Sequence, residues 1–198
     1  MLEPTTPVLD DFNRANGNLT GAMYAAIFNL DILSNKIVPR AATTGGDAFT
    51  AATYKGDQEV WALVSSLSTG AIYLRCAWDR NTDSGYLTHV TNTGQAFLSR
   101  YDNGVENVLN GSSLGAIASG DIYLLRIARA EIEVWCGRAG VWTIRTTGID
   151  TTYNTGCLAV GVFNDTDQST SVDEWGGGYA GEAPNILAQR SHPRLPLR

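Results

Sequence analysis

The sequence predicts an all-β protein built from two stacked antiparallel sheets. Apolar and polar residues alternate with a period of two along most of the chain, which is typical of half-buried strands. Turn signals such as Asn16-Gly17, Asp102-Asn103-Gly104 and Asn110-Gly111 break the alternation. No stretch places apolar residues at helical spacing for three turns. Many antiparallel strands without helices bury their apolar faces against each other, so a two-layer sandwich is expected.

The alternation predicts the strands in order. They span residues 8–13, 22–28, 31–38, 47–54, 58–66, 71–79, 85–91, 95–101, 104–110, 121–128, 131–136, 141–146, 157–163 and 170–176. The hairpin from Ile122 to Cys136 is the clearest, with a short turn near Arg129-Ala130. Tyr123, Leu125 and Ile127 are predicted to share one face of the first strand, and Ile132, Val134 and Cys136 of the second strand to point to the core. Its predicted outward residues include Glu131, Glu133 and Trp135.

Two segments at opposite ends of the chain carry a family resemblance. The first is Asp10-Asp11-Phe12-Asn13-Arg14-Ala15-Asn16-Gly17, and the second is Ser171-Val172-Asp173-Glu174-Trp175-Gly176. They resemble the first and last strands of the concanavalin A-like lectin and glucanase domains. Residues 122–136 and Thr155–Phe163 are similar to inner strands of the same domains, so the resemblance covers about residues 9–180. It implies a jelly-roll sandwich whose first and last strands pair, a fold that serves glycan binding, glycan hydrolysis and structural assembly.

The ends of the chain differ from the middle. We expect an N-terminal arm over residues 1–7, the lectin-like sandwich over 8–181, and an extended C-terminal arm over 182–198 that contains proline and arginine. The C-terminal arm holds Glu182 and three arginines, a charge of about +2 within a chain of −6. Either it is a solvated end or it straps onto a partner. The candidate partner-binding residues are Leu187, Arg190, Arg194, Leu195, Leu197 and Arg198.

Composition narrows the class of protein. The net charge of −6 over 198 residues argues against a nucleic-acid binder, which normally has a basic face. No segment has the roughly 18 apolar residues needed to span a membrane. The first residues show neither the basic nor the apolar region of a signal peptide. Cys76, Cys136 and Cys157 form no CxxC pair and are expected to be buried free thiols. Zinc is not expected, since His89 and His192 lack ligand spacing.

Catalytic carboxylates are not expected. Hydrolases of this fold place Glu-x-Asp-x-x-Glu, or a version one residue shorter, on one strand. The nearest candidate is Glu131-Ile132-Glu133, and the third acidic position is Trp135 or Cys136. A solvated strand face is the simpler interpretation of these glutamates. No Gly-x-Ser-x-Gly elbow is present either. The protein is therefore predicted not to be an enzyme.

Calcium is a weak alternative at two loops. Asp79, Asn81 and Asp83 imitate the start of a calcium loop, but Ser84 and Val90 stand where glycine and glutamate belong. A hairpin turn is the better interpretation. A second loop offers oxygen ligands from Asn164, Asp165 and Asp167. No cofactor is predicted beyond these two alternatives.

Glycan binding by this fold needs an outward aromatic residue with polar partners. Trp135 has outward parity on its strand, while Tyr73 and Arg75 lie opposite the alternating Ile72, Leu74, Cys76 and Trp78. An aromatic ring packed on a sugar, with Arg75 donating hydrogen bonds, is physically reasonable. The alternative for Trp135 is packing under a loop or against a neighbouring subunit.

These observations favour a non-catalytic bacteriophage virion protein, in a decoration, head-fibre or tail-associated position. It would assemble in the host cytoplasm as a homo-oligomer or in symmetric copies beside other virion subunits, and aid adsorption to host-surface polysaccharide. The missing export signal, the missing catalytic set and the two arms support this hypothesis. A free-standing carbohydrate-binding module is the alternative. A glycoside hydrolase is the weakest of the three.

Overall fold

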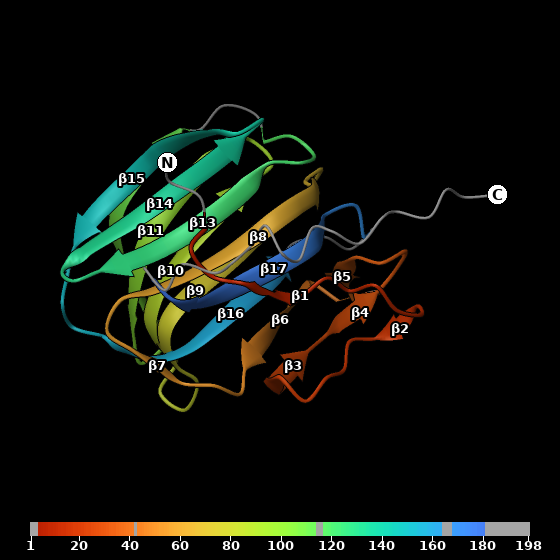
Figure 1. Ribbon diagram of the computed structural model, residues 1–198, viewed down its shortest axis with the longest axis horizontal. Helices are drawn as coiled ribbons and strands as arrows, with labels where there is room; N and C mark the ends of the chain where they lie inside the picture. The colour runs from red at the N-terminus through yellow and green to blue at the C-terminus, as the bar shows by residue number, and fades with distance from the viewer. Residues whose placement is uncertain (1–3, 42, 114–116, 164–167, 181–198) are drawn as a thin grey trace.

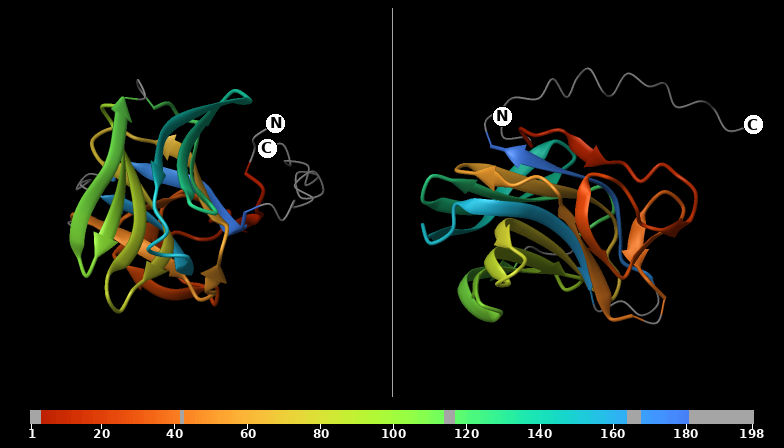
Figure 2. Two further views of the ribbon diagram at one scale, coloured as in Figure 1. Left: turned by 90° about the vertical axis from the view of Figure 1, so that its left-hand side faces the viewer. Right: turned by 90° about the horizontal axis from the view of Figure 1, so that it is seen from below.

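The computed structural model is a two-sheet antiparallel sandwich, described for residues 4–41, 43–113, 117–163 and 168–180. Sheet A has the strand order β15-β14-β13-β8-β17-β5-β4-β2, with β1 on β17, and sheet B has β12-β11-β10-β9-β16-β6-β3, with β7 on β16. Figure 1 shows sheet A in front of sheet B, and Figure 2 shows the two curved layers from the side. The described residues form no helix, hence none that could cross a membrane. The strands are β1 (Val8–Asp10), β2 (Gly17–Asn18), β3 (Tyr24–Phe28), β4 (Leu30–Ile32), β5 (Ile37–Pro39), β6 (Gly45–Thr50), β7 (Tyr54–Lys55), β8 (Gln58–Ser66), β9 (Ala71–Asp79), β10 (Ser84–Thr91), β11 (Gln95–Asp102), β12 (Val105–Ser113), β13 (Ile122–Ala128), β14 (Glu131–Arg138), β15 (Val141–Ile149), β16 (Thr155–Phe163) and β17 (Ser171–Tyr179).

The first and last strands pair, as the sequence predicts. Val8 lies opposite Gly176, and Asp10 opposite Trp175. The Asp10 carboxylate accepts two hydrogen bonds of 2.7 Å from the Arg14 guanidinium and one of 2.6 Å from the Tyr24 hydroxyl. Burial opposes ionisation of Asp10, but these hydrogen bonds outweigh it and lower its pKa. The N-terminal motif therefore folds a turn and joins it to the core through Tyr24, which stacks on Trp175.

The core lies between the sheets and contains Ile132 and Val134, which the sequence predicts to point inward. Tyr123, Leu125 and Ile127 on β13 and Ile132 and Val134 on β14 are all buried there. The turn between these strands is two residues long, and Arg129 adopts a left-handed φ of 60° although it is not glycine. The three cysteines are buried and free, which confirms the prediction for them.

The predicted strand at 31–38 is wrong in one respect, because it is a hairpin. Leu33 and Lys36 exchange backbone hydrogen bonds of 2.9 and 3.2 Å. Ser34 and Asn35 between them have φ values of 53° and 62°, the left-handed pair of a type I′ turn. Neither residue is glycine, so the sequence gives no strong turn signal here. Because apolar residues alternate with polar ones on both sides of the turn, the pattern resembles one continuous strand.

The N-terminal segment packs on the outer face of sheet A. Figure 1 shows it in red, in front of β8 and β17. Glu59 on β8 is fully buried and accepts hydrogen bonds from the backbone N–H groups of Thr5 and Thr6. Its second oxygen accepts from Arg126 at 2.6 and 2.9 Å. Residues 4–7 of the predicted N-terminal arm therefore pack on the sandwich of their own chain. Residues 1–3 and the C-terminal arm lie outside the described residues.

Replacement of Glu59 tests this buried anchor. E59Q keeps the shape of the side chain but removes the negative charge that pairs with the buried Arg126 guanidinium. We expect a loss of about 3–5 kcal/mol in the free energy of unfolding, measured by urea denaturation. E131Q, at an exposed position of the same sheet, is the matched control. Equal midpoints for the two variants would show that the anchor contributes nothing.

Candidate functional site

The outer face of sheet B carries a ladder of aromatic rings. Antiparallel register places His89 of β10 between Tyr73 of β9 and Phe97 of β11. The Tyr73 and His89 ring centroids are 5.1 Å apart with an interplanar angle of 24°, and those of His89 and Phe97 are 4.8 Å apart. Phe163 of β16 packs beside Tyr73 with centroids 4.5 Å apart. Because these rings point away from the core, packing of the core does not explain why aromatic residues stand at these positions.

Arg75 lies among these rings. It is only 8% exposed, and its guanidinium carbon is 4.9 Å from the Trp78 ring centroid. The rings of Phe49, Tyr73 and Phe163 lie 5.6–5.8 Å from the same atom. Cation–π contacts of this kind are strengthened by removal from water. The guanidinium is therefore held inside a cage of four rings.

Asp47 of β6 neutralises Arg75 through an ion pair. Gly161 of β16 lies between Asp47 and Tyr73 in the sheet. A Cβ at Gly161 would come within 2.1 Å of the Asp47 carboxylate, so glycine leaves the space that this carboxylate occupies. Burial raises the pKa of Asp47, and Arg75 opposes that rise.

Several buried polar atoms of this face have no hydrogen-bond partner. They are Arg75 Nε, Trp78 Nε1 and His89 Nδ1, half of the six such side-chain atoms found in the described part of the chain. Buried polar groups in native proteins are rarely left unpaired. Arg75 Nε and Trp78 Nε1 are hydrogen-bond donors. The arrangement therefore suits a ligand or water rich in acceptor oxygens.

The far end of this face adds a polar corner. Tyr101 of β11 packs on Trp78 with ring centroids 5.4 Å apart. Ser99 Oγ donates a hydrogen bond of 2.7 Å to Glu106 of β12. Burial, with the nearby Glu106 carboxylate, raises the pKa of Tyr101 to about 12. Burial also lowers the pKa of His89 and outweighs the opposing effect of Glu106. The lowered pKa favours a neutral imidazole at neutral pH.

We call this outer side of sheet B the aromatic face. It is formed by Asp47, Phe49, Tyr73, Arg75, Trp78, His89, Phe97, Ser99, Tyr101, Glu106 and Phe163.

The structure brings together two of the three predicted glycan-binding residues. Tyr73 and Arg75 lie at the centre of the aromatic face, whereas Trp135 lies on β14, in sheet A. The Trp135 indole N–H donates a hydrogen bond of 3.0 Å to Glu133. Glu131 is on the same strand as Glu133. Neither of the two glutamates considered as catalytic carboxylates therefore lies in sheet B.

Sequence reasoning missed Trp78 for a specific reason. Alternation along β9 placed it with Ile72, Leu74 and Cys76 on the core side. Ala77 adopts a φ of 49°, and the register with both neighbouring strands shifts at this point. This irregularity turns Ala77 inward and Trp78 outward, where it packs in the cluster with Phe49. The placement of Trp78 on the core side is thus corrected.

The first of the two loops considered for calcium is a hairpin turn between β9 and β10. Residues 80–83 form this turn, and Asp79 Oδ1 accepts a hydrogen bond from the Asn81 N–H. Across the described ranges, no three His, Cys, Asp or Glu side chains are grouped so as to hold a metal ion. The second loop, with Asn164, Asp165 and Asp167, lies outside the described residues, as do the six candidate residues of the C-terminal arm.

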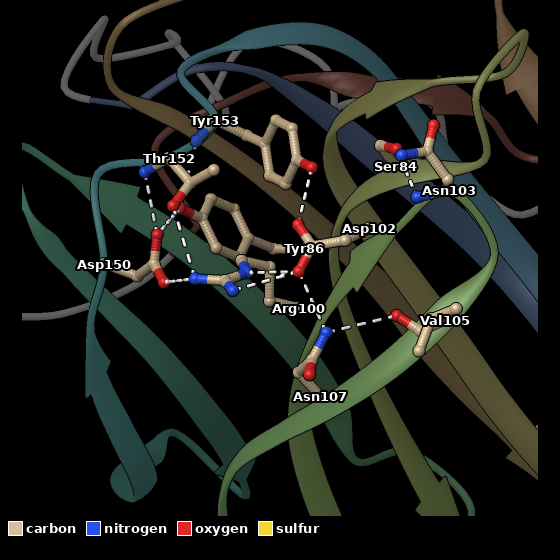
Figure 3. Close-up of polar contacts among 10 residues, drawn as sticks. All are labelled: Ser84, Tyr86, Arg100, Asp102, Asn103, Val105, Asn107, Asp150, Thr152 and Tyr153. Carbon is tan, nitrogen blue, oxygen red and sulfur yellow. Dashed lines mark hydrogen bonds and ion pairs between the residues drawn. The ribbon is translucent and has the colours of Figure 1, made fainter.

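A second polar cluster closes one end of the sandwich (Figure 3). Asp150, just after β15, accepts hydrogen bonds from the Tyr86 hydroxyl at 2.6 Å and from Arg100 at 2.7 Å. Arg100 also donates to Asp102, which accepts a further bond from the Tyr153 hydroxyl. The polar groups of this cluster are paired with each other, unlike Arg75 Nε, Trp78 Nε1 and His89 Nδ1 on the aromatic face. The cluster therefore joins the loop that follows β15 of sheet A to strands β10 and β11 of sheet B.

Comparison with solved structures identifies the fold. The exoplasmic domain of VIP36 superposes with a TM-score of 0.68 at 9% identity, over 93% of each chain. The chain has the concanavalin A-like lectin and glucanase fold. A Bacillus licheniformis β-glucanase matches with a TM-score of 0.55 at 14% identity, over 87% of this chain and 97% of its own. The carbohydrate-binding module CBM66 from Bacillus subtilis gives 0.54 at 12% identity, over 74% and 86%. No protein-family model matches the sequence, and no curated protein matches it.

The Asp150 cluster generates a pH-dependent prediction. Burial alone would raise the pKa of Asp150, but hydrogen bonds from Tyr86, Thr152 and Arg100 lower it from 3.8 to about 2. A lowered folded-state pKa stabilises the protein above the unfolded value, and this contribution is lost as the pH falls from about 4 to about 2. We expect D150N to lower the unfolding free energy by about 1–2 kcal/mol at neutral pH, with the gap to wild type narrowing through that window.

Urea unfolding at a series of pH values measures this gap. D11N, at an exposed position outside the cluster, controls for the loss of one negative charge. A gap for D150N that stays constant from pH 7 to pH 2 would contradict the account.

Proposed function

We propose that this protein binds carbohydrate without cleaving it, and that the aromatic face is its binding surface. The observation that carries the proposal is the combination, on one outward face, of half-buried rings with buried donors that lack partners. Sugars present C–H faces that pack on aromatic rings and oxygens that accept hydrogen bonds. A site of a few convergent polar groups within an apolar lining is typical of ligand binding.

The neighbours of the fold support this class of ligand. VIP36 is described with mannose oligosaccharides bound, and CBM66 is by name a carbohydrate-binding module. The β-glucanase carries the name of a polysaccharide-cleaving enzyme. Mannose disaccharide and β-glucan oligosaccharides are therefore sensible first probes.

The state of the acids supports binding over catalysis. Glycoside hydrolysis generally uses two carboxyl groups, one as acid and one as base or nucleophile. On the aromatic face, Asp47 is ion-paired with Arg75 and Glu106 accepts a hydrogen bond from Ser99. Glu131 and Glu133 belong to the other sheet.

Loss of one ring from the aromatic face tests the proposal. Y73A removes the central ring of the ladder and one wall of the Arg75 cage. On a glycan array and by calorimetry with the best hit, we expect about a tenfold loss of affinity, equivalent to about 1.4 kcal/mol. W135A, an aromatic truncation on sheet A, is the matched control and is expected to bind as wild type does.

Two results would overturn the assignment. Loss of binding in W135A with retention in Y73A would move the site to sheet A. Absence of binding by the wild-type chain to every glycan tested would remove the function itself. A thermal melt of each variant shows whether its fold is intact.

The finer proposal is a role as a non-catalytic bacteriophage virion component, with the aromatic face used for adsorption to host-surface polysaccharide. It is supported by two of the sequence features that suggested it, namely the predicted terminal arms and the missing Glu-x-Asp-x-x-Glu pattern. Cryo-electron microscopy of purified particles tests it. We expect this chain in symmetric copies on the particle surface, and particles that lack the chain would refute the role.

A further inference from the structure

The ladder of rings on sheet B ends at a glycine on each side. Tyr73 of β9 lies opposite Gly161 of β16 on one side and opposite His89 of β10 on the other. His89 lies opposite Phe97 of β11, and Phe97 lies opposite Gly111 of β12. Three rings on neighbouring strands are therefore flanked by two positions without a side chain. We call the space above Gly111, beside the Phe97 ring, the edge slot.

The two glycines differ in what fills the space above them. A Cβ at Gly161 would come within 2.1 Å of the Asp47 carboxylate, so another side chain occupies that space. A Cβ at Gly111 would stand 3.2 Å from the Phe97 ring, and its three closest contacts are two atoms of that ring and the Ala96 carbonyl. In the described part of the chain β12 is the last strand of sheet B, and Gly111 is exposed. The edge slot is therefore open to solvent.

Phe97 keeps one ring face without an aromatic partner among the described residues. Its centroid is 4.8 Å from that of His89 at an interplanar angle of 31°, so its first face lies toward His89. His89 is covered on both sides, by Phe97 and Tyr73, and Tyr73 also packs on Phe163. The second face of Phe97 lies toward the edge slot, and Phe97 is partly exposed. A ring-shaped group in the slot would continue the ladder.

The polar surroundings of the edge slot suit the hydroxyls of a neutral sugar. Gln95 and Ser113 form the next outward pair of β11 and β12, and both are exposed. An amide and a hydroxyl can each donate and accept hydrogen bonds. Further along β12, Glu106 is exposed and makes no ion pair with the residues that the structure describes, while Arg75 is neutralised by Asp47. An acidic sugar would therefore meet uncompensated negative charge on this face.

We propose that one neutral pyranose residue of the bound glycan stacks on the free face of Phe97 in the edge slot, with its hydroxyls hydrogen-bonded to Gln95 and Ser113. This proposal rests on the proposed function and adds to it the place of one sugar residue and its charge class. The C–H face of a pyranose packs on an aromatic ring much as the rings of the ladder pack on each other. Gly111 determines access to this site, because a larger side chain there would cover the ring.

Two variants change the edge slot from opposite sides. G111V fills it, and the backbone at Gly111 is not in the left-handed region that disfavours valine. F97L removes the ring face and keeps an apolar side chain. By calorimetry with the best neutral hit of a glycan array, we expect each variant to lose about tenfold in affinity while its thermal melt shows an intact fold. In the ¹⁵N-labelled wild-type chain, we expect the Gly111 amide signal to shift in a saturable manner with the same glycan.

Matched controls lie away from the edge slot. F28L changes a phenylalanine that is 56% exposed on β3, the opposite edge strand of sheet B. T147V places a valine at an exposed position of β15, the edge strand of sheet A. Both are expected to bind as wild type does. An oligogalacturonide, whose sugar residues carry carboxylates, is expected to bind more weakly than the neutral glycan.

The outcomes separate this proposal from the proposed function. Loss of binding in Y73A with wild-type affinity in a folded F97L or G111V would keep the aromatic face as the binding surface and overturn the edge slot. A Gly111 amide signal that does not shift while the glycan binds would also overturn the slot. Loss in F28L with retention in F97L would move the stacked sugar to β3. Preference for the oligogalacturonide would overturn the neutral class, and a wild-type chain that binds no glycan would overturn the proposed function and this proposal with it.

Discussion

The aromatic face depends on how a buried arginine is neutralised on the outside of a sheet. Arg75 is as buried as a core residue, and a buried cation without a partner would destabilise the fold strongly. Asp47 supplies the negative charge, and the missing side chain of Gly161 supplies the space for it. The four rings then pack around the guanidinium. The positions of the proposed binding residues thus follow from one ion pair and one glycine.

The two outer faces of the sandwich differ in how their polar atoms are paired. On sheet A, Glu59 anchors the N-terminal segment, and the indole N–H groups of Trp61 and Trp135 have acceptors. On sheet B, Arg75 and Trp78 keep donors without partners. Burial of unpaired donors is unfavourable, and a ligand with acceptor oxygens removes that penalty. This difference supports the proposal of a polar ligand on sheet B, whereas the outer face of sheet A holds the N-terminal segment.

Much of the fold could be predicted from the sequence, because strand parity and turn residues are local signals. The paired end strands, the hairpin around Arg129 and the burial of the cysteines were predicted. The turn at Ser34-Asn35 and the irregularity at Ala77 were not predicted. All three residues adopt a left-handed backbone conformation, which a sequence normally signals with glycine, and none of them is glycine. Of the site, Tyr73 and Arg75 were found by parity. Their neighbours Phe49, His89, Phe97 and Phe163 come from four other strands, and only the strand order brings them together. Trp135 shares their outward parity but belongs to the other sheet.

The central claim is that the unpartnered donors of the aromatic face receive a sugar. Nuclear magnetic resonance of the ¹⁵N-labelled full chain reports on these donors directly, through the Trp78 indole and Arg75 Nε–H signals. During titration with mannose disaccharide or a β-glucan oligosaccharide, the account predicts that both signals shift in a saturable manner while the Trp135 indole signal stays in place. Saturable shifts confined to Trp61, Trp135 or Trp142 would contradict it.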